Sequence, residues 1–300
     1  MLSIDDFKPL DLEDKPLFDR YYKKFPPFHS DQLFTTMISW NDYAHYHYTL
    51  IKNHLIIMTI INNQVQFRNP MGRHDREICY QVLKLAKNVE SNYSLGFIDH
   101  TSKVYLTKNF PKLEFIPQRG YFDYVYLSSE LAKLEGEKFR KIRNRLNKFK
   151  KKNIYTTEDI SKENMEEVRK FLKRWCLWRD CESDKILKNE KKAIIYSMKH
   201  FFDLDLSGLV LRVNEKIEAI SVYEKMDEET VVIHYEKGSP YYDGIYKAIN
   251  QEVAERVCTK YRYINRESDM DAPGLRQAKM SYRPHHLVKV FAVNKKNIQF

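Results

Sequence analysis

Cysteine is scarce in this chain of 300 residues, and its four cysteines follow no metal-binding pattern. No CxxC motif occurs, and the closest pair, Cys176 and Cys181, lies five positions apart. This spacing argues against a zinc site and against a disulfide framework. We therefore expect reduced thiols, a cytoplasmic location and no bound metal.

Long hydrophobic runs are absent as well. The longest apolar stretch, Leu55–Ile61, has the length of a strand and is far too short to cross a bilayer. The N-terminal segment carries acidic side chains and lacks the apolar region of a secretory signal. The sequence thus predicts no transmembrane segment and no export signal.

The composition is that of a folded, basic protein. Hydrophobic residues make up 43% of the chain, which excludes a disordered protein. Fifty-one Lys and Arg residues against 41 Asp and Glu residues give a formal charge of +10. This bias favours an anionic partner such as RNA, a phosphorylated ligand or an anionic lipid headgroup, and we do not expect DNA. A solvated, lysine-rich surface is the alternative explanation.

The chain repeats one order of predicted elements in its two halves. The second half is predicted as strand, helix, helix, three strands, helix and strand, over residues 154–156, 162–175, 190–202, 207–213, 216–225, 230–235, 245–259 and 261–265. This order is typical of an acetyltransferase-type fold. We therefore predict an α/β (α+β) protein of tandem GNAT-like halves, with mixed sheets flanked by helices. The predicted halves are residues 1–136 and 153–300, and a basic helix over 137–152 connects them.

The connecting helix is amphipathic. Its apolar side chains recur at spacings of three and four and predict one buried stripe: Phe139, Ile142, Leu146 and Phe149. Basic residues fill most other positions. The candidates for binding a polyanion such as tRNA, or a phospholipid headgroup, are Lys141, Arg143, Arg145 and Lys148. The alternative is a solvated basic face.

The densest polar cluster follows the last predicted strand, where α/β folds commonly bind ligands. It contains Asn265, Arg266, Glu267 and Asp269, and then three side chains spaced three apart, Arg276, Lys279 and Tyr282. This spacing places the last three on one face if the segment is helical. The alternative is a self-satisfied network of ion pairs that closes the C-terminal lobe.

Two further features precede this cluster. Strand alternation places His234 and Glu236 on one face of their strand, where they could act as general base and orienting group or merely tie the sheet together. The following loop, Tyr241-x-x-Gly244-x-Tyr246, has the position of a pyrophosphate-binding loop at a helix N-terminus. Gly244 suits that role only weakly, because the tyrosine ring at 246 would crowd a phosphate. The loop therefore argues against coenzyme A.

Three segments in the same order resemble the family named for the C-terminal domain of phosphatidylglycerol lysyltransferase. They cover residues 122–149, 233–254 and 263–284 and include the motifs DYVYLSSELAKLEGEKFRKIRNRL, HYEKGSPYYDGIYKAIN and YINRESDMDAPGLRQAKMSYRP. The resemblance implies a tandem acetyltransferase-like fold, similar to the Fem-type aminoacyltransferases that use aminoacyl-tRNA. It also implies an aminoacyl or acyl transferase without a cofactor, whose acceptor is an amine or hydroxyl of a lipid or a small molecule.

On this hypothesis each polar cluster has a role. Arg276 and Lys279 would contact an anion or the developing oxyanion, and His234 or Glu236 would serve as base. The substrate-binding candidates are Asn250, Asn265, Arg266, Glu267, Asp269 and Tyr282, with Glu267 or Asp269 recognising an ammonium group. The other hypothesis is a non-catalytic binding module of the same fold that holds RNA or a phosphorylated ligand.

Overall fold

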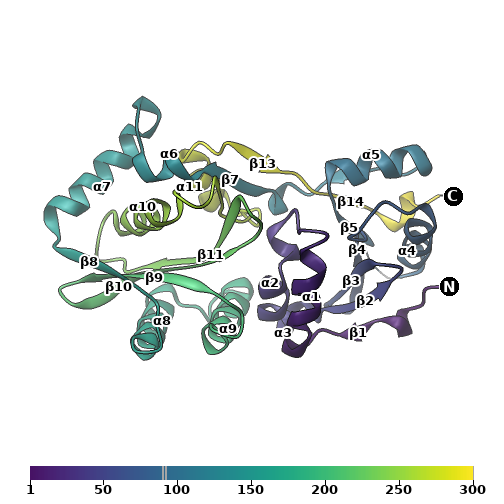
Figure 1. Ribbon diagram of the computed structural model, residues 1–300, viewed down its shortest axis with the longest axis horizontal. Helices are drawn as coiled ribbons and strands as arrows, with labels where there is room; N and C mark the ends of the chain where they lie inside the picture. Colours follow the sequence, from purple (N-terminus) through teal and green to yellow (C-terminus); the bar gives the residue numbers. More distant parts are fainter. Residues whose placement is uncertain (90, 92, 300) are drawn as a thin grey trace. The chain divides into compact units, whose positions relative to one another are not determined.

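The computed structural model describes residues 1–89, 91 and 93–299, and the chain divides into two compact units. The first unit comprises Met1–Phe122 and Val288–Phe300, and the second comprises Asp123–Leu287. Each unit contains a seven-stranded mixed sheet with helices packed against it (Figure 1). In the part of the chain that is described, no helix is long and apolar enough to cross a membrane.

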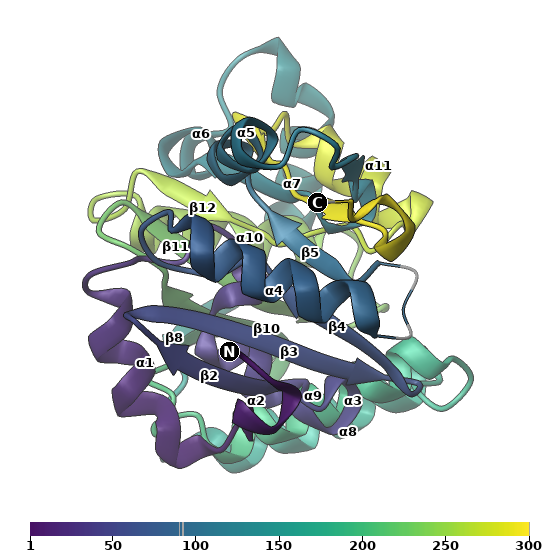
Figure 2. The same cartoon turned by 90° about the vertical axis from the view of Figure 1, so that its right-hand side faces the viewer.

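The sheet of the first unit has the strand order β1-β2-β3-β4-β5-β14-β6. A two-residue turn joins β2 to β3, and its residues Lys52 and Asn53 both have positive φ, which suits a tight hairpin. Figure 2 faces this unit and shows α4 lying across the sheet, where its apolar side chains enter the core. The elements are η1 Ile4–Asp6, β1 Lys8–Pro9, η2 Leu12–Asp14, α1 Lys15–Tyr22, η3 Ser30–Gln32, α2 Phe34–Ser39, α3 Asn41–Ala44, β2 His47–Ile51, β3 His54–Ile61, β4 Gln64–Arg68, α4 Arg76–Asn88, β5 Leu95–Ile98, α5 His100–Asn109, β6 Ile116–Pro117, η4 Arg119–Tyr121, β14 Phe291–Val293 and η6 Lys295–Asn297.

The sheet of the second unit has the order β13-β7-β12-β11-β10-β9-β8. Helices α7 and α10 lie on one face of it and α8 and α9 on the other (Figure 1). The elements are β7 Asp123–Leu127, α6 Ser128–Lys133, η5 Glu137–Phe139, α7 Arg140–Lys152, β8 Tyr155–Asp159, α8 Met165–Arg179, α9 Lys185–Lys199, β9 Ser207–Val213, β10 Lys216–Lys225, β11 Thr230–Gly238, α10 Ile245–Val257, β12 Tyr263–Asn265, α11 Pro273–Ser281 and β13 His286–Val288. The predicted order of the second half is confirmed.

The two sheets share one topology, and each is completed by a strand from outside its own half. In the second sheet β7 lies between β12 and β13, and in the first sheet β14 lies between β5 and β6. This confirms the predicted tandem acetyltransferase-like α/β class. The division falls at residues 122/123 and 287/288, and not around residues 137–152, because strand pairing assigns β7 to the second sheet and β14 to the first.

Helix α7 belongs to the core of the second unit and is not a free connector. Its apolar side chains Ile142, Leu146 and Phe149, together with Phe139 at the end of η5, are buried in the same cluster as the apolar side chains of α10. The stripe predicted from the spacing is therefore confirmed.

The feature that positions the candidate site is the separation of two central strands. The parallel pair β11–β12 is hydrogen-bonded only from Thr230 to Val232 along β11. Strand β12 then ends at Asn265, whereas β11 continues to Gly238. The sheet therefore opens between the C-terminal part of β11 and the chain that follows β12.

Candidate functional site

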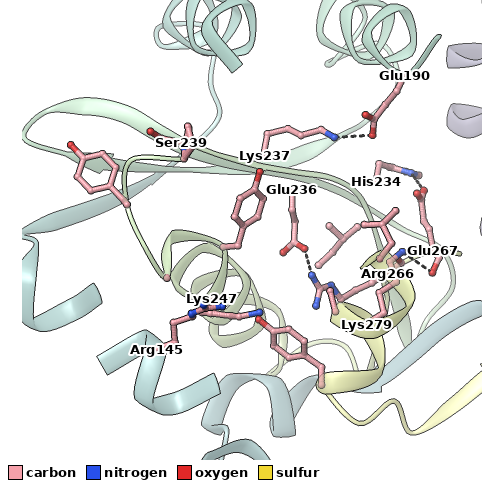
Figure 3. A pocket seen from close by; sticks show the side chains of 18 of the residues that line it. Arg145, Glu190, His234, Glu236, Lys237, Ser239, Lys247, Arg266, Glu267 and Lys279 are labelled. Atoms are coloured by element: carbon pink, nitrogen blue, oxygen red, sulfur yellow. Dashed lines mark hydrogen bonds and ion pairs between the residues drawn. The ribbon is translucent and has the colours of Figure 1, made fainter. Parts of the chain in front are cut away.

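A pocket of about 530 Å³ lies in the second unit where β11 and β12 separate (Figure 3). Its walls come from β11, the loop into α10 and the first turn of α10, the segment after β12, and α11, with one side chain each from α7 and α9. The lining contains both apolar surface and several ionisable groups. The charged groups are the cations Arg145, Lys237, Lys247, Arg266 and Lys279, the carboxylates Glu190, Glu236, Asp243 and Glu267, and His234.

A buried ion pair forms one wall. Glu236 accepts a hydrogen bond from Arg266 Nη2 through Oε2 and another from Asn250 Nδ2 through Oε1, the latter at 3.0 Å. The side chains of Arg266 and Glu236 are 14% and 11% exposed. The guanidinium of Arg266 also lies 4.9 Å from the centre of the Tyr282 ring. Because both carboxylate oxygens of Glu236 already accept hydrogen bonds, this group is a structural anion in the wall and is poorly placed to act as a base.

Lys247, in the first turn of α10, is a pocket residue that the sequence patterns did not single out. Its Nζ lies 4.6 Å from the centre of the Tyr282 ring. Among the residues that the structure describes, it is the lining cation with no hydrogen-bond acceptor or ion-pair partner. Burial, and then the positive charge of Arg266, lower the pKa of Lys247 to about 8. The only feature of the sequence that could have indicated Lys247 is its position, three residues after Gly244 at the N-terminus of a predicted helix.

His234 does not fit the predicted base role. Val222 pairs with Tyr235 and Tyr223 with Ile233, so His234 is the extra residue of a β-bulge. Its ring nitrogens hold Glu267 and Glu224, each at 2.8 Å. Burial alone lowers the pKa of His234, but the two carboxylates outweigh it and raise the pKa to about 10. The ring is therefore an imidazolium with no nitrogen open to accept a proton.

Lys279 positions the segment after β12. Its ammonium donates to the backbone carbonyls of Arg266, Glu267 and Ser268, at 2.5, 3.1 and 2.5 Å. All three of its N–H groups are thus used, although burial lowers the pKa of Lys279 to about 8. The predicted oxyanion contact does not fit this geometry, because no donor is left for a ligand.

The rest of the C-terminal cluster forms a network outside the pocket. Arg276 holds the fully buried Asp269 through two hydrogen bonds of 2.8 and 2.9 Å, and Asp269 also accepts from Tyr124 Oη at 2.6 Å. Asn265 is equally buried and donates to Asp123 at 2.8 Å. Here the self-satisfied network considered from the sequence describes the structure better than a ligand site does.

The predicted site residues therefore divide into two groups. The pocket is lined by His234, Glu236, Gly244, Arg266, Glu267, Tyr282, Lys279 and Arg145. Its lining does not include Asn250, Asn265, Asp269, Arg276, Lys141, Arg143 or Lys148. The lining of the pocket thus combines residues from four separated parts of the sequence, and proximity in sequence did not decide which polar residues reach it.

The loop before α10 is the segment for which the sequence predicted a poor fit to the pyrophosphate of coenzyme A. Gly244 has φ +96°, and a Cβ there would lie 2.7 Å from the carbonyl oxygen of Arg145, so close packing against α7 explains this glycine. Tyr246 Oη donates to the carbonyl of Gly238 at 3.2 Å, which holds the ring over the end of β11. The Asp243 carboxylate also lines the pocket.

The basic face of α7 is partly occupied. Arg143 donates to the carbonyls of Leu134 and Gly136, both at 2.6 Å. Arg145 and Lys148 hold Asp243 at 3.1 and 3.2 Å. Lys141 is exposed and has no such partner among the described residues. Elsewhere in the described chain, no group of three or more His, Cys, Asp or Glu side chains is arranged to hold a metal ion.

Comparison with known proteins identifies the family of this chain. The family model of the phosphatidylglycerol lysyltransferase C-terminal domain matches residues 22–294. A conserved protein of unknown function from Bacteroides thetaiotaomicron is 30% identical, with a TM-score of 0.89 over 96% of this chain and 99% of that one. No curated protein matches the sequence.

Two more distant structures share the fold. L-PGS from Bacillus licheniformis has a TM-score of 0.65 at 15% identity and covers 94% of this chain and 92% of its own. FemX has a TM-score of 0.59 at 10% identity and covers 97% and 98%. The resemblance seen in the sequence is thereby confirmed, and the chain belongs to the family of the phosphatidylglycerol lysyltransferase C-terminal domain.

Proposed function

We propose that the second unit transfers an aminoacyl group from the ester of an aminoacyl-tRNA to an amine or hydroxyl acceptor. The family and the fold support an aminoacyl or acyl transferase. The observation that carries the proposal is the pocket between β11 and β12, in which Lys247 is the cation without an acceptor among the described residues. The donor class follows from the resemblance to the Fem-type enzymes.

The chemistry needs positioning and charge stabilisation more than a strong base, because the donor ester is already activated. Attack on the ester carbonyl places negative charge on its oxygen. The Lys247 ammonium can stabilise that charge and donate a proton to the leaving ribose oxygen. The resulting neutral amine then takes the proton that the acceptor nucleophile loses, which restores the ammonium. A pKa of about 8 keeps Lys247 mostly protonated at neutral pH and close to the range that favours proton transfer.

Arg266 provides a second positive charge with a fixed position. Its ion pair with Glu236 and its contact with Tyr282 hold the guanidinium before a substrate arrives. Such preorganised charge costs no reorganisation during the reaction. We assign no step to coenzyme A, since Asp243 and Tyr246 occupy the loop where its pyrophosphate would bind.

The alternative is a binding module without turnover. It is favoured by one observation: Glu236, His234 and Lys279 all have their hydrogen-bonding groups engaged within the protein, which leaves no evident general base. In that case the pocket would hold the end of an RNA or a phosphorylated ligand through Lys247 and Arg266.

A transfer assay separates the two functions. The full chain is incubated with tRNA charged with labelled amino acids and with cell extract as the source of acceptors, and the label is followed into an RNA-free product. We expect Lys247→Ala to lower kcat by about 10²–10³-fold, the usual cost of removing one oxyanion donor. Lys216→Ala, which removes an exposed lysine of β10, is the matched control.

Unchanged transfer by Lys247→Ala would refute the role of this lysine. Wild-type protein that binds charged tRNA and transfers nothing, with every extract tested, would favour the binding module.

A further inference from the structure

Two aromatic side chains of the second unit, one exposed and one half-buried, form a pair. The rings of Trp178, on α8, and Tyr241, in the loop before α10, meet edge to face with centroids 5.5 Å apart. Tyr241 is 74% exposed, and Leu177 next to Trp178 is 81% exposed. Exposed apolar surface gathered in one place commonly marks a site of interaction.

The pair is held rigidly from below. Trp178 packs edge to face on Phe171, and the guanidinium of Arg174 lies 6.0 Å from the Trp178 ring centre. Arg174 is itself anchored by a 2.9 Å hydrogen bond to the carbonyl of Ile217. A ring fixed on one side and open on the other loses little entropy when a flat group stacks on it.

Chain connectivity places the pair at the rim of the pocket. Ser239, Pro240 and Tyr242 all line the pocket, and Tyr241 lies between the last two in the sequence. Tyr241 is therefore next in the chain to two residues of the pocket wall.

The C-terminal part of α8 is basic, although the loop that follows it carries Asp180, Glu182 and Asp184. Residues 170–179 of α8 contain four basic side chains and no acidic one. Of these, Lys173 and Arg179 are exposed and have no hydrogen-bond or ion-pair partner among the described residues. Aromatic rings beside unpaired cations are the combination that binds single-stranded nucleic acid, where bases stack and phosphates are neutralised.

We propose that Tyr241 and Trp178 form a stacking platform for an unpaired base at the 3′ end of an RNA, with Lys173 and Arg179 contacting its phosphates. The inference rests on the proposed function for one step only, the identification of the donor as a tRNA. An aminoacyl ester in the pocket is attached directly to the terminal nucleotide, so the neighbouring unpaired nucleotides must lie at the pocket rim.

The test measures binding of fluorescein-labelled single-stranded RNA of sequence ACCA to the full chain by fluorescence anisotropy. We expect Tyr241→Ala to weaken binding about tenfold, within the range for loss of one base-stacking contact. Tyr241→Phe should bind as the wild type does, because it keeps the ring. Phe202→Ala removes an aromatic side chain of the same unit that is 46% exposed and serves as the control. Because Tyr241 is mostly exposed, its variants should melt within a few degrees of the wild type.

Several outcomes would overturn the platform. One is equal binding by Tyr241→Ala and the wild type, and another is equally tight binding of a fully paired duplex, since that needs only phosphate contacts. A third is Tyr241-dependent binding to phosphatidylglycerol vesicles without Tyr241-dependent RNA binding, which would identify a membrane surface as the partner. The transfer assay distinguishes failure of this inference from failure of the proposed function. If RNA binding depends on Tyr241 but no transfer occurs, the stacking platform is supported and the enzymatic function is refuted. If transfer occurs but RNA binding does not depend on Tyr241, the enzymatic function is supported and the platform is refuted.

Discussion

The Glu236–Arg266 pair allows a quantitative test of whether this carboxylate is a scaffold or a base. Glu236→Ala leaves the Arg266 guanidinium without its counter-ion in a wall where its side chain is only 14% exposed. Asn250 also loses its acceptor, and its own Oδ1 is already without a partner among the described atoms. Removing one member of a buried ion pair costs roughly 3–5 kcal/mol. We therefore expect the second unit to lose about 3 kcal/mol of unfolding free energy or more.

Three matched variants sharpen this prediction. Asp159→Ala breaks a surface ion pair between Asp159 and Arg256, in which the side chains are 63% and 40% exposed. This change should lower the unfolding free energy by about 0–1 kcal/mol. Glu236→Gln should cost less than Glu236→Ala, because an amide still accepts from Arg266 and a flipped Asn250 can pair with it. Replacing both partners, as in Glu236→Leu with Arg266→Met, should recover much of the loss, since no unpaired charge then remains buried.

Urea unfolding followed by tryptophan fluorescence is a suitable assay, because Trp175 and Trp178 lie in the second unit and report on it. A cost of about 3 kcal/mol corresponds to a decrease in Tm of roughly 10 °C for a unit of this size. A Glu236→Ala protein as stable as Asp159→Ala would refute the reasoning. A Glu236→Gln protein of wild-type stability with no transfer activity would instead return Glu236 to the role of base.

Three further predictions follow from the same geometry. If the Lys247 ammonium is required, kcat/KM falls as pH rises through about 8, and in Lys247→Arg this decrease shifts to higher pH. If the decrease stays at the same pH in Lys247→Arg, another group such as Lys279 causes it. The folded-state pKa of His234 is raised to about 10, so the protonated ring contributes fully to the unfolding free energy below about pH 6.5, and this contribution is lost as pH rises toward 10. In His234→Gln the unfolding free energy, measured by urea unfolding, should therefore change less with pH over that range. A fragment of residues 123–287 should fold alone and show cooperative melting by circular dichroism, whereas 153–300 should not, because it lacks β7 from the interior of its sheet. A stable 153–300 fragment would contradict this account of the unit boundaries.

Much of the fold could be predicted from the sequence because its signals are local. The spacing of Ile142, Leu146 and Phe149 predicted a helix with one buried face, and that face packs into the core. The element order of the second half predicted the acetyltransferase-like class, which the strand order confirms. The sequence did not reveal that β7, from the first half of the chain, completes the second sheet, or that β14, from the second half, completes the first sheet. Strand pairing between distant segments leaves no periodic pattern in the sequence.

The candidate site was predicted less well, for a related reason. The sequence placed charged residues near a strand end, but their roles depend on partners that lie far away along the chain. Asp269 is held by Tyr124 across 145 positions, and His234 is held by Glu224 and Glu267 from two other segments.

By itself the sequence determined which segments form helices and strands, which faces are buried, the basic character of the protein and its family. Only the tertiary structure decided which charges neutralise one another and which remain available. Periodicity and propensity act within a few neighbouring residues, whereas the state of a buried charge depends on every group packed around it. That is why Arg276 and Lys279, prominent in the sequence, are engaged in holding the protein together, while Lys247 faces the pocket without a hydrogen-bond acceptor among the described residues.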